Sequence, residues 1–359
     1  MMDRNKQGRE KQLSTGYKAM PVYQENLSGL VLISLLMLAL LPGDVSAASP
    51  QVVKAAEQEG KVVYSTTMSV QETDRVLRDF KKKYPRITAE SFRLTKEKLV
   101  TRLLAEDAAN RTTADVVSVN DMVMELLRLK GVLGQYDNPE AAVYGPGFKE
   151  KNGYWTGLYG PTAVIVYNSR LVKPEDVPKS YDDLLLPRWK GKMGMDGTKW
   201  EWFAAQLQIM GQEKGMTFMK KLVAQNLQFR TGITLLTQLT AAGEFPLIVY
   251  GYAHSAEEFI SRGAPIGWVP VQPIFMNMVG VGLTAHAPHP NAARLLVEYL
   301  TSKEGQGVIS SMHRVPVRPD VPADPPRLTQ GLKFFSLKPE TAENYRDFEK
   351  LFLKTFLGK

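Results

Sequence analysis

Residues 162–195, TAVIVYNSRLVKPEDVPKSYDDLLLPRWKGKMGM, contain the step from one folding unit to the next. The apolar, β-branched run AVIVY at 163–167 is typical of a strand buried on both faces. Pro174 and Pro178 exclude a long helix after it, because proline breaks a helix interior. A short helix over YDDLL follows, with Ser180 placed as its N-cap, and GKMGM begins another strand. The segment therefore predicts a strand that leaves one lobe and a second lobe that starts behind it.

Strands and helices alternate on both sides of this segment. Before it, we expect strands at 61–65, 87–92 and 114–119 and helices at 70–84, 96–109 and 121–130. After it, we expect strands at 192–196 and 245–250 and helices at 201–211, 215–225, 235–242, 255–262, 291–300 (with Asn291 as N-cap) and 303–311. This alternation favours parallel sheets with helices on both faces. The predicted fold class is therefore α/β, in two lobes.

The two lobes are expected to be joined by a hinge of two segments. The chain crosses into the second lobe at 159–162 and returns through the apolar run MVGVGLT at 278–284. An amphipathic helix is expected at 340–356, after a proline-rich stretch. The expected boundaries are 48–158 and 279–325 for the first lobe, 159–278 for the second, and 326–359 for a C-terminal extension.

The N-terminus has the pattern of a secretory signal peptide. Five basic residues precede the apolar run Leu30 to Leu41, and Val45-Ser46-Ala47 supplies small residues at the cleavage positions. The apolar run is short for a bilayer span, although an uncleaved membrane anchor stays open as an alternative. We expect residues 1–47 to be removed and the mature protein to reside in the periplasm.

Composition and charge limit the classes of ligand. The chain has no cysteine, which excludes disulfides and thiolate metal sites. It has 45 Lys and Arg against 37 Asp and Glu, a formal charge of +8, and loss of the signal peptide lowers this by one. A basic surface favours an anionic ligand through long-range attraction, although a basic balance is also common among exported binding proteins. The basic residues are dispersed without interleaved aromatic residues, so we expect no nucleic acid partner.

The opening segment also resembles a known family. Val-Tyr-Asn, followed by Pro-x-x-Val-Pro-x-Ser-Tyr-x-Asp-Leu and Trp-Lys-Gly-Lys, resembles the solute-binding proteins of bacterial ABC importers. The group concerned contains binders of ferric iron, phosphorylated sugars, phosphonates and thiamine. The resemblance continues through GEFPLIVYGYAHSAEEFISRGAPIGWVP at 243–270 and GVGLTAHAPHPNAARLLVEYLTSKEGQ at 280–306, and covers roughly 61–319.

The resemblance implies a periplasmic binding protein fold of type II and a receptor role. Such a protein would hold a small anion, an organic phosphate, phosphonate or carboxylate, between its lobes and present the closed form to an inner-membrane ABC permease. We expect a monomer without a cofactor. No paired nucleophile and base supports an enzyme, and a sensory protein on the same scaffold is the other alternative.

The first lobe offers candidate ligand contacts at its strand ends. In open α/β sheets, ligands bind beyond the carboxyl ends of the strands, at helix N-termini. Ser65, Thr66 and Thr67 follow the first strand, and Asn120 follows the third. Arg93 follows the second strand and could bind an anion with two hydrogen bonds. The alternative for these residues is a capping or solvent-exposed role.

The second lobe and the hinge offer five further candidates. Thr198 lies between a strand and a helix, and Arg230 and Thr231 precede another helix. Tyr159 and Thr162 lie in the first crossing, where contacts with a ligand in the cleft are expected.

The segment Tyr250-Gly251-Tyr252-Ala253-His254 decides between an anion and iron. Ferric-iron binders carry two adjacent tyrosines at the corresponding strand end, whereas here Tyr252 is followed by Ala253. We therefore expect Tyr252 and His254 to contact an organic ligand, and we predict no metal site. A ferric-iron receptor of the same fold is the alternative.

Overall fold

The structure, a computed structural model, describes residues 49–342 and 344–358. The predicted signal peptide, residues 1–47, lies outside the described residues. Within the part that is described, every helix is too short or too polar to cross a membrane.

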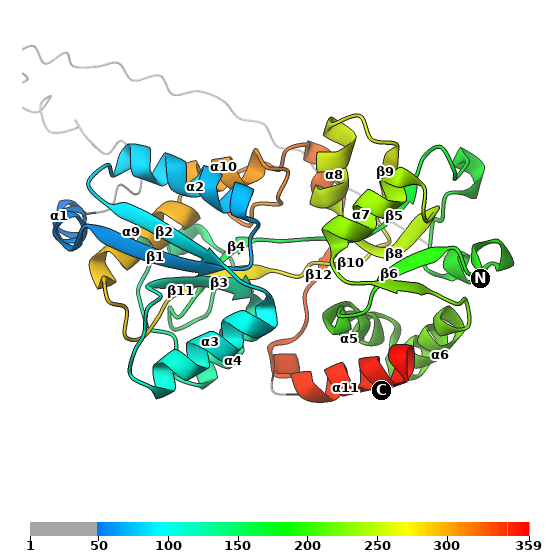
Figure 1. The fold of residues 1–359 in the computed structure, drawn as a ribbon, viewed down its shortest axis with the longest axis horizontal. Helices are drawn as coiled ribbons and strands as arrows, with labels where there is room; N and C mark the ends of the chain where they lie inside the picture. Colours follow the sequence, from blue (N-terminus) through cyan, green and yellow to red (C-terminus); the bar gives the residue numbers. More distant parts are fainter. Residues whose placement is uncertain (1–48, 343, 359) are drawn as a thin grey trace, which may run out of the picture. The chain divides into compact units, whose positions relative to one another are not determined.

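The first sheet has the strand order β2-β1-β3-β11-β4. Its strands are β1 (Lys61–Thr66), β2 (Thr88–Arg93), β3 (Val116–Asn120), β4 (Thr156–Tyr159) and β11 (Val279–Leu283). One face is covered by α1 (Pro50–Glu59), α2 (Val70–Lys83), α9 (Pro290–Thr301) and α10 (Lys303–Ser310), and the other by α3 (Lys96–Ala108) and α4 (Asp121–Leu129) (Figure 1). We call this sheet and its helices the first lobe.

The second sheet has the strand order β7-β6-β8-β5-β9. Its strands are β5 (Ala163–Asn168), β6 (Met193–Asp196), β7 (Gln228–Arg230), β8 (Leu247–Tyr252) and β9 (Ile266–Val269). The helices α7 (Ile233–Ala242) and α8 (Ala253–Ser261) cover one face, and α5 (Trp200–Met210), α6 (Gln212–Val223) and α11 (Tyr345–Leu357) cover the other (Figure 1). These elements form the second lobe. The residue bounds predicted for the two lobes stay a prediction.

Both sheets are mixed, so the prediction of parallel sheets is wrong for one part of each. β1 runs parallel to β2 and β3, but β11 runs antiparallel to β3 and β4. Likewise, β6 is parallel to β7 and β8, whereas β5 is antiparallel to β8 and β9. A strand that enters a sheet from the hinge must run opposite to the strands that end there. As a result, β1, β3, β4, β6 and β8 all end on the hinge side.

Three local predictions need correction. The short helix predicted after Ser180 is the 3₁₀ helix η3 (Asp182–Leu185), with Tyr181 at the N-cap position, although the Ser180 hydroxyl accepts the backbone N–H of Asp183 at 3.3 Å. Asn291 is not the N-cap of α9, which begins at Pro290. Instead, the Glu59 carboxylate accepts the backbone N–H of Asn291 and of the next residue at 2.7–3.1 Å, and so caps this helix from outside. The C-terminal helix begins at Tyr345, five residues later than predicted.

Besides the two predicted crossings, the chain has a third. After α10 the chain leaves the first lobe, and Ala323 and Leu328 join the core of the second. Next, β12 (Phe334–Phe335) pairs in parallel with β10 (Ile274–Phe275). Finally, α11 packs against α5 and α6. The C-terminal segment is therefore an integral part of the second lobe.

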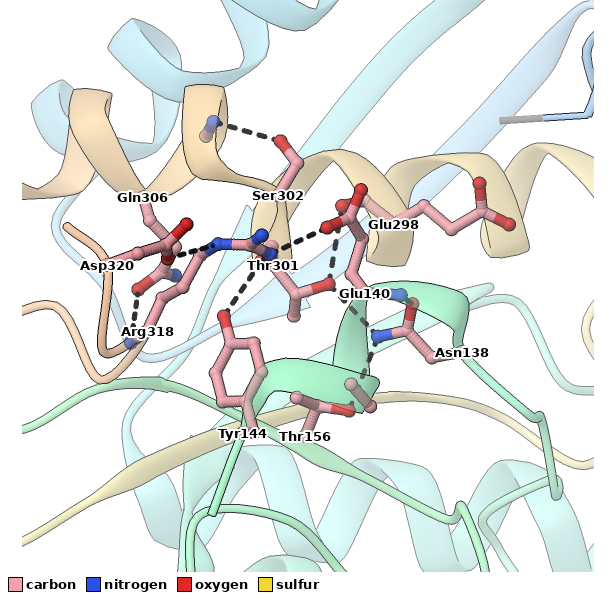
Figure 2. Close-up of polar contacts among 12 residues, drawn as sticks. Asn138, Glu140, Tyr144, Thr156, Glu298, Thr301, Ser302, Gln306, Arg318 and Asp320 are labelled. Carbon is pink, nitrogen blue, oxygen red and sulfur yellow. Dashed lines mark hydrogen bonds and ion pairs between the residues drawn. The ribbon is translucent and has the colours of Figure 1, made fainter. Parts of the chain in front are cut away.

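A buried polar network fixes the start of this third crossing (Figure 2). Arg318 Nη1 donates to Glu140 Oε2 at 2.6 Å and to the Thr301 carbonyl at 3.0 Å, and its Nε donates to Asp320 at 2.7 Å. Gln306 Oε1 accepts the backbone N–H of Arg318 at 3.4 Å. Arg318 and Glu140 are 5% and 3% exposed, so the pair is stable only because its hydrogen bonds are satisfied.

Candidate functional site

Side chains from both lobes meet where the strands end at the hinge. We call six of them the interlobe cluster: Tyr64, Glu72, Tyr159, Tyr252, His254 and Arg314. The Arg314 guanidinium lies 4.3 Å from the centre of the Tyr159 ring. Charges on Glu72 and Arg314 act on the pKa of His254, and Tyr252 acts on the pKa of Tyr159, so the two halves of the cluster lie within electrostatic reach.

The first lobe contributes a charged pair. Glu72 lies in the first turn of α2 and forms a capping box with Ser69. Arg314 donates to both oxygens of Glu72, from Nε at 2.6 Å and from Nη2 at 2.8 Å. Burial alone would raise the pKa of Glu72, but the guanidinium outweighs it and lowers that pKa to about 2. Both groups are therefore charged at neutral pH.

The second lobe contributes two stacked rings. Tyr252 ends β8 and His254 lies in the first turn of α8, with ring centres 5.3 Å apart and an angle of 20° between the planes. The Tyr252 hydroxyl accepts a hydrogen bond from Asn277 at 3.4 Å. Burial, helped by the positive charge of Arg314, lowers the pKa of His254 to about 3. The imidazole is therefore neutral at pH 7 and can donate or accept a hydrogen bond.

Side-chain hydroxyl groups of β1 and β3 lie within hydrogen-bond distance of one another. Ser118 Oγ lies 2.5 Å from the Tyr64 hydroxyl and 2.7 Å from Thr66 Oγ1. Thr66 also accepts the backbone N–H of Met68 at 3.1 Å. Ser65 differs, because its hydroxyl oxygen is buried and has no hydrogen-bond partner among the described residues. An unmet buried hydroxyl at a strand end is a candidate ligand contact.

A second group of charges lies beside the cluster, at the N-termini of α3, α4 and α5. Glu201 Oε1 accepts hydrogen bonds from Lys96 Nζ at 2.5 Å and from Asn120 Nδ2 at 3.1 Å. Burial, helped by the Glu201 charge, raises the pKa of Asp121 to about 7. Burial would lower the pKa of Lys199, but nearby Tyr252 and acidic groups raise it, so this amine stays protonated.

Seven of the predicted contacts lie at or beside this region. Tyr159 and Thr66 are buried, and Asn120 both caps α4 and reaches across to the second lobe. Thr162 is buried in the first crossing, where its carbonyl accepts the Ala253 N–H at 3.1 Å. Ser65, Tyr252 and His254 complete the set that the structure brings together.

Five predicted contacts are engaged elsewhere or exposed. Arg230 pairs with Glu244 at 2.6 Å, and exposed Thr231 follows it. Thr198 donates to Asp196 at 2.8 Å. Arg93 is exposed at the end of β2, an edge strand.

Thr67 is half-buried, and its backbone N–H donates to the Ser118 carbonyl at 3.3 Å. For these five positions, as for the other seven, ligand contact stays a prediction.

The charged residues of the candidate site were not predicted from the sequence. Glu72 carries a readable signal, the Ser-x-x-Glu capping box, but that signal predicts a helix start and not a site. Arg314 lies between a helix and a proline-rich stretch and has no local signal at all. Lys96 and Glu201 look like ordinary surface charges near helix N-termini.

The donor set of the cluster fits a ferric ion poorly. The described residues contain no group of three His, Asp or Glu side chains placed to hold a metal. The Glu72 carboxylate, the only acidic member of the cluster, is bound by Arg314 through both oxygens. Burial raises the pKa of Tyr64 and Tyr159, which makes phenolate ligands costly to form.

A separate surface pocket lies away from these groups. It has a volume of about 300 Å³ and is formed by η3 and α6. Its lining includes charged side chains of both signs, such as Asp182 and Lys214, and it shares no residue with the interlobe cluster. We therefore assign the candidate site to the interlobe cluster, on the basis of the chemistry of its side chains.

Solved structures share the fold. The iron-bound HitA of Pseudomonas aeruginosa aligns with a TM-score of 0.71 at 22% identity, over 81% of this chain and 99% of that one. AfuA of Actinobacillus pleuropneumoniae with exogenous fructose-6-phosphate aligns with a TM-score of 0.73 at 21% identity, over 83% and 99%.

Curated proteins of the same kind match part of the sequence. The "Fe(3+)-binding periplasmic protein" of Serratia marcescens is 23% identical over 220 residues, which are 58% of this chain and 64% of that protein. "Iron uptake protein A1" of Synechocystis is 25% identical over 192 residues, 48% and 53% of the two chains. The chain thus spans between half and two thirds of the length of these relatives.

A family model described as "Bacterial extracellular solute-binding protein" matches residues 111–344. Because this match covers well over half of the sequence and the fold agrees, the chain belongs to the bacterial extracellular solute-binding proteins.

Proposed function

We propose that the protein is the periplasmic receptor of an ABC importer and that it captures a small organic anion, a phosphate, phosphonate or carboxylate, between its lobes. The observation that carries the proposal is the Arg314 guanidinium at the hinge-side strand ends. It is 8% exposed and lies beside the Tyr252 ring and the neutral, hydrogen-bonding imidazole of His254. Family membership and the predicted signal peptide support the receptor role, and we assign no enzymatic activity.

Charge favours an anion over a cation at this site. Arg314 is permanently protonated and Lys199 adds a second positive charge near Tyr252. Glu72 holds Arg314 in place through two of its nitrogens, so the guanidinium keeps an orientation suited to a second oxyanion. A ferric ion would meet this positive charge with no free carboxylate in the cluster.

A ferric-iron receptor is the second candidate. Relatives named for iron binding favour it, as do the tyrosines Tyr64, Tyr159 and Tyr252 around Arg314. Such a site would require Arg314 to release Glu72 and at least one buried phenol to ionise.

Under either candidate, the proposed receptor works as a monomer and delivers its ligand to an inner-membrane permease.

A thermal-shift screen tests the two candidates together. The mature protein is heated with phosphorylated sugars, phosphonates, carboxylates or Fe(III)-citrate, because a ligand that binds only the folded state raises the melting temperature. The anion proposal expects stabilisation by an organic anion that is lost in Arg314→Lys and kept in Arg262→Lys, a surface arginine that pairs with Glu258 outside the interlobe cluster. Stabilisation by Fe(III) alone, with a visible tyrosinate absorption band, would replace it by the iron receptor.

A further inference from the structure

One ion pair joins the two lobes directly. Lys96 is the first residue of α3 in the first lobe, and Glu201 is the second residue of α5 in the second. Lys96 Nζ and Asn120 Nδ2 both donate to Glu201 Oε1, at 2.5 and 3.1 Å. Glu201 is only 3% exposed, although both of its donors come from the other lobe.

One of the two donors, Asn120, is held in place independently of Glu201. Asn120 Oδ1 caps α4 by accepting the backbone N–H of Val123 at 3.3 Å, which orients the amide. The Lys96 ammonium also lies 5.3 Å from the centre of the ring of Trp200, the first residue of α5, so it makes a second contact with the second lobe. The first lobe therefore presents a preformed amide donor beside the Lys96 ammonium, and burial of Glu201 strengthens the attraction of the charges.

The bond pattern can exist only while the lobes touch. If the lobes separate, Glu201 loses both donors and the carboxylate returns to water. An interaction made in one of two states shifts the equilibrium toward that state by its own free energy. A ligand that binds the closed state gains affinity in proportion to the fraction of molecules that are closed.

We infer that Glu201 is a latch, held by Lys96 and Asn120, that sets the balance between the closed and open arrangements of the lobes. It is a positioning residue that acts on ligand affinity without touching the ligand. The inference rests on the proposed receptor role for its purpose, but the latch itself can be measured without any ligand.

The absence of cysteine makes the measurement direct. Lys81→Cys in α2 and Lys220→Cys in α6 replace exposed residues of the two lobes and give two unique sites for spin labels. Distance distributions are recorded by double electron–electron resonance with no added ligand. They are compared for the parent, Glu201→Gln, Lys96→Met and the matched control Glu258→Gln, whose carboxylate pairs with Arg262 within the second lobe at 2.6 Å.

We expect Glu201→Gln and Lys96→Met each to lower the ratio of short to long distances by about tenfold, the value of one charge-assisted hydrogen bond. The double variant should show no further loss, because both changes remove the same contact. The control should match the parent. An unchanged distribution in Glu201→Gln would overturn the latch, whereas a failed ligand screen with a shifted distribution would overturn only the proposed function.

Discussion

Arg314 binds both carboxylate oxygens of Glu72 at 2.6 and 2.8 Å, across a sequence separation of 242 residues. The pair joins the first turn of α2 to the start of the third crossing. It also places a guanidinium against Tyr159 at the edge of the hinge. One contact therefore fixes the C-terminal segment and orients the charge at the candidate site.

Glu72 should make the protein sensitive to acid. Its pKa is about 2 in the folded protein against an ordinary value of 4.5, so its contribution is complete above pH 4.5 and is lost as the pH falls toward 2. Glu72→Gln should lower the free energy of unfolding by about 3 kcal/mol at pH 7 and by little at pH 2. Urea titrations at both pH values measure this. A constant difference between them would contradict it, and the exposed Glu97→Gln serves as the control.

Asp121 should have the opposite effect. Its pKa is about 7 in the folded protein and 3.8 ordinarily, so stability is complete below pH 3.8 and falls as the pH rises through 7. Asp121→Asn mimics the protonated form and keeps an acceptor for the Met122 N–H. It should gain up to about 4 kcal/mol over the parent at pH 8 and nothing at pH 4. Melting temperatures across this range report the gain, and equal profiles would show that Asp121 ionises freely.

The Arg318 network should be costly to break from one side. Arg318→Met leaves the Glu140 carboxylate buried without its main partner and should lower the free energy of unfolding by about 3–5 kcal/mol. Adding Glu140→Gln removes the stranded charge and should restore part of the loss. Denaturant unfolding of the two variants tests this. Equal stability of the single and double variants would show that Glu140 was not stranded.

Ser65 should separate ligand binding from stability. Its buried hydroxyl has no partner among the described residues, and an unsatisfied polar group costs about 1–3 kcal/mol. Ser65→Ala should therefore leave the ligand-free protein as stable or more stable, while weakening the thermal shift produced by the anion. Thr66→Ala is the contrast, because Thr66 already bonds Ser118 and Met68 and its loss should destabilise the protein without ligand. A full ligand shift in Ser65→Ala would remove Ser65 from the site.

The fold was predictable where the signal is local. The strand predicted at 163–167 is β5, because an unbroken β-branched run has few alternatives to a buried strand. The helix predicted at 70–84 is α2, which ends one residue earlier. The mixed pairing of the sheets was not readable, because strand direction depends on which side of the sheet the chain enters.

The site was predictable only in part, for the same reason. Tyr252 and His254 were predicted because they lie at a strand end, a position that a local pattern identifies; the structure places both in the interlobe cluster, and their contact with a ligand stays a prediction. Arg314 was not predicted, because no residue near it in the sequence indicates a contact with Glu72. Likewise, the cap of α9 comes from Glu59, 232 residues before Asn291, so a local rule chose the wrong residue.

The position of α11 has a consequence for how the chain acquires its structure during synthesis and export. Phe352 and Phe356 are buried in the second lobe, where both pack against Phe203 with ring centres about 6 Å apart. A polypeptide that emerges with its N-terminus first cannot complete this core until residues 345–357 have also emerged. The second lobe is thus unfinished until nearly the whole described chain is available, and for the proposed periplasmic receptor this would keep the nascent chain loose enough to be threaded through a translocation channel.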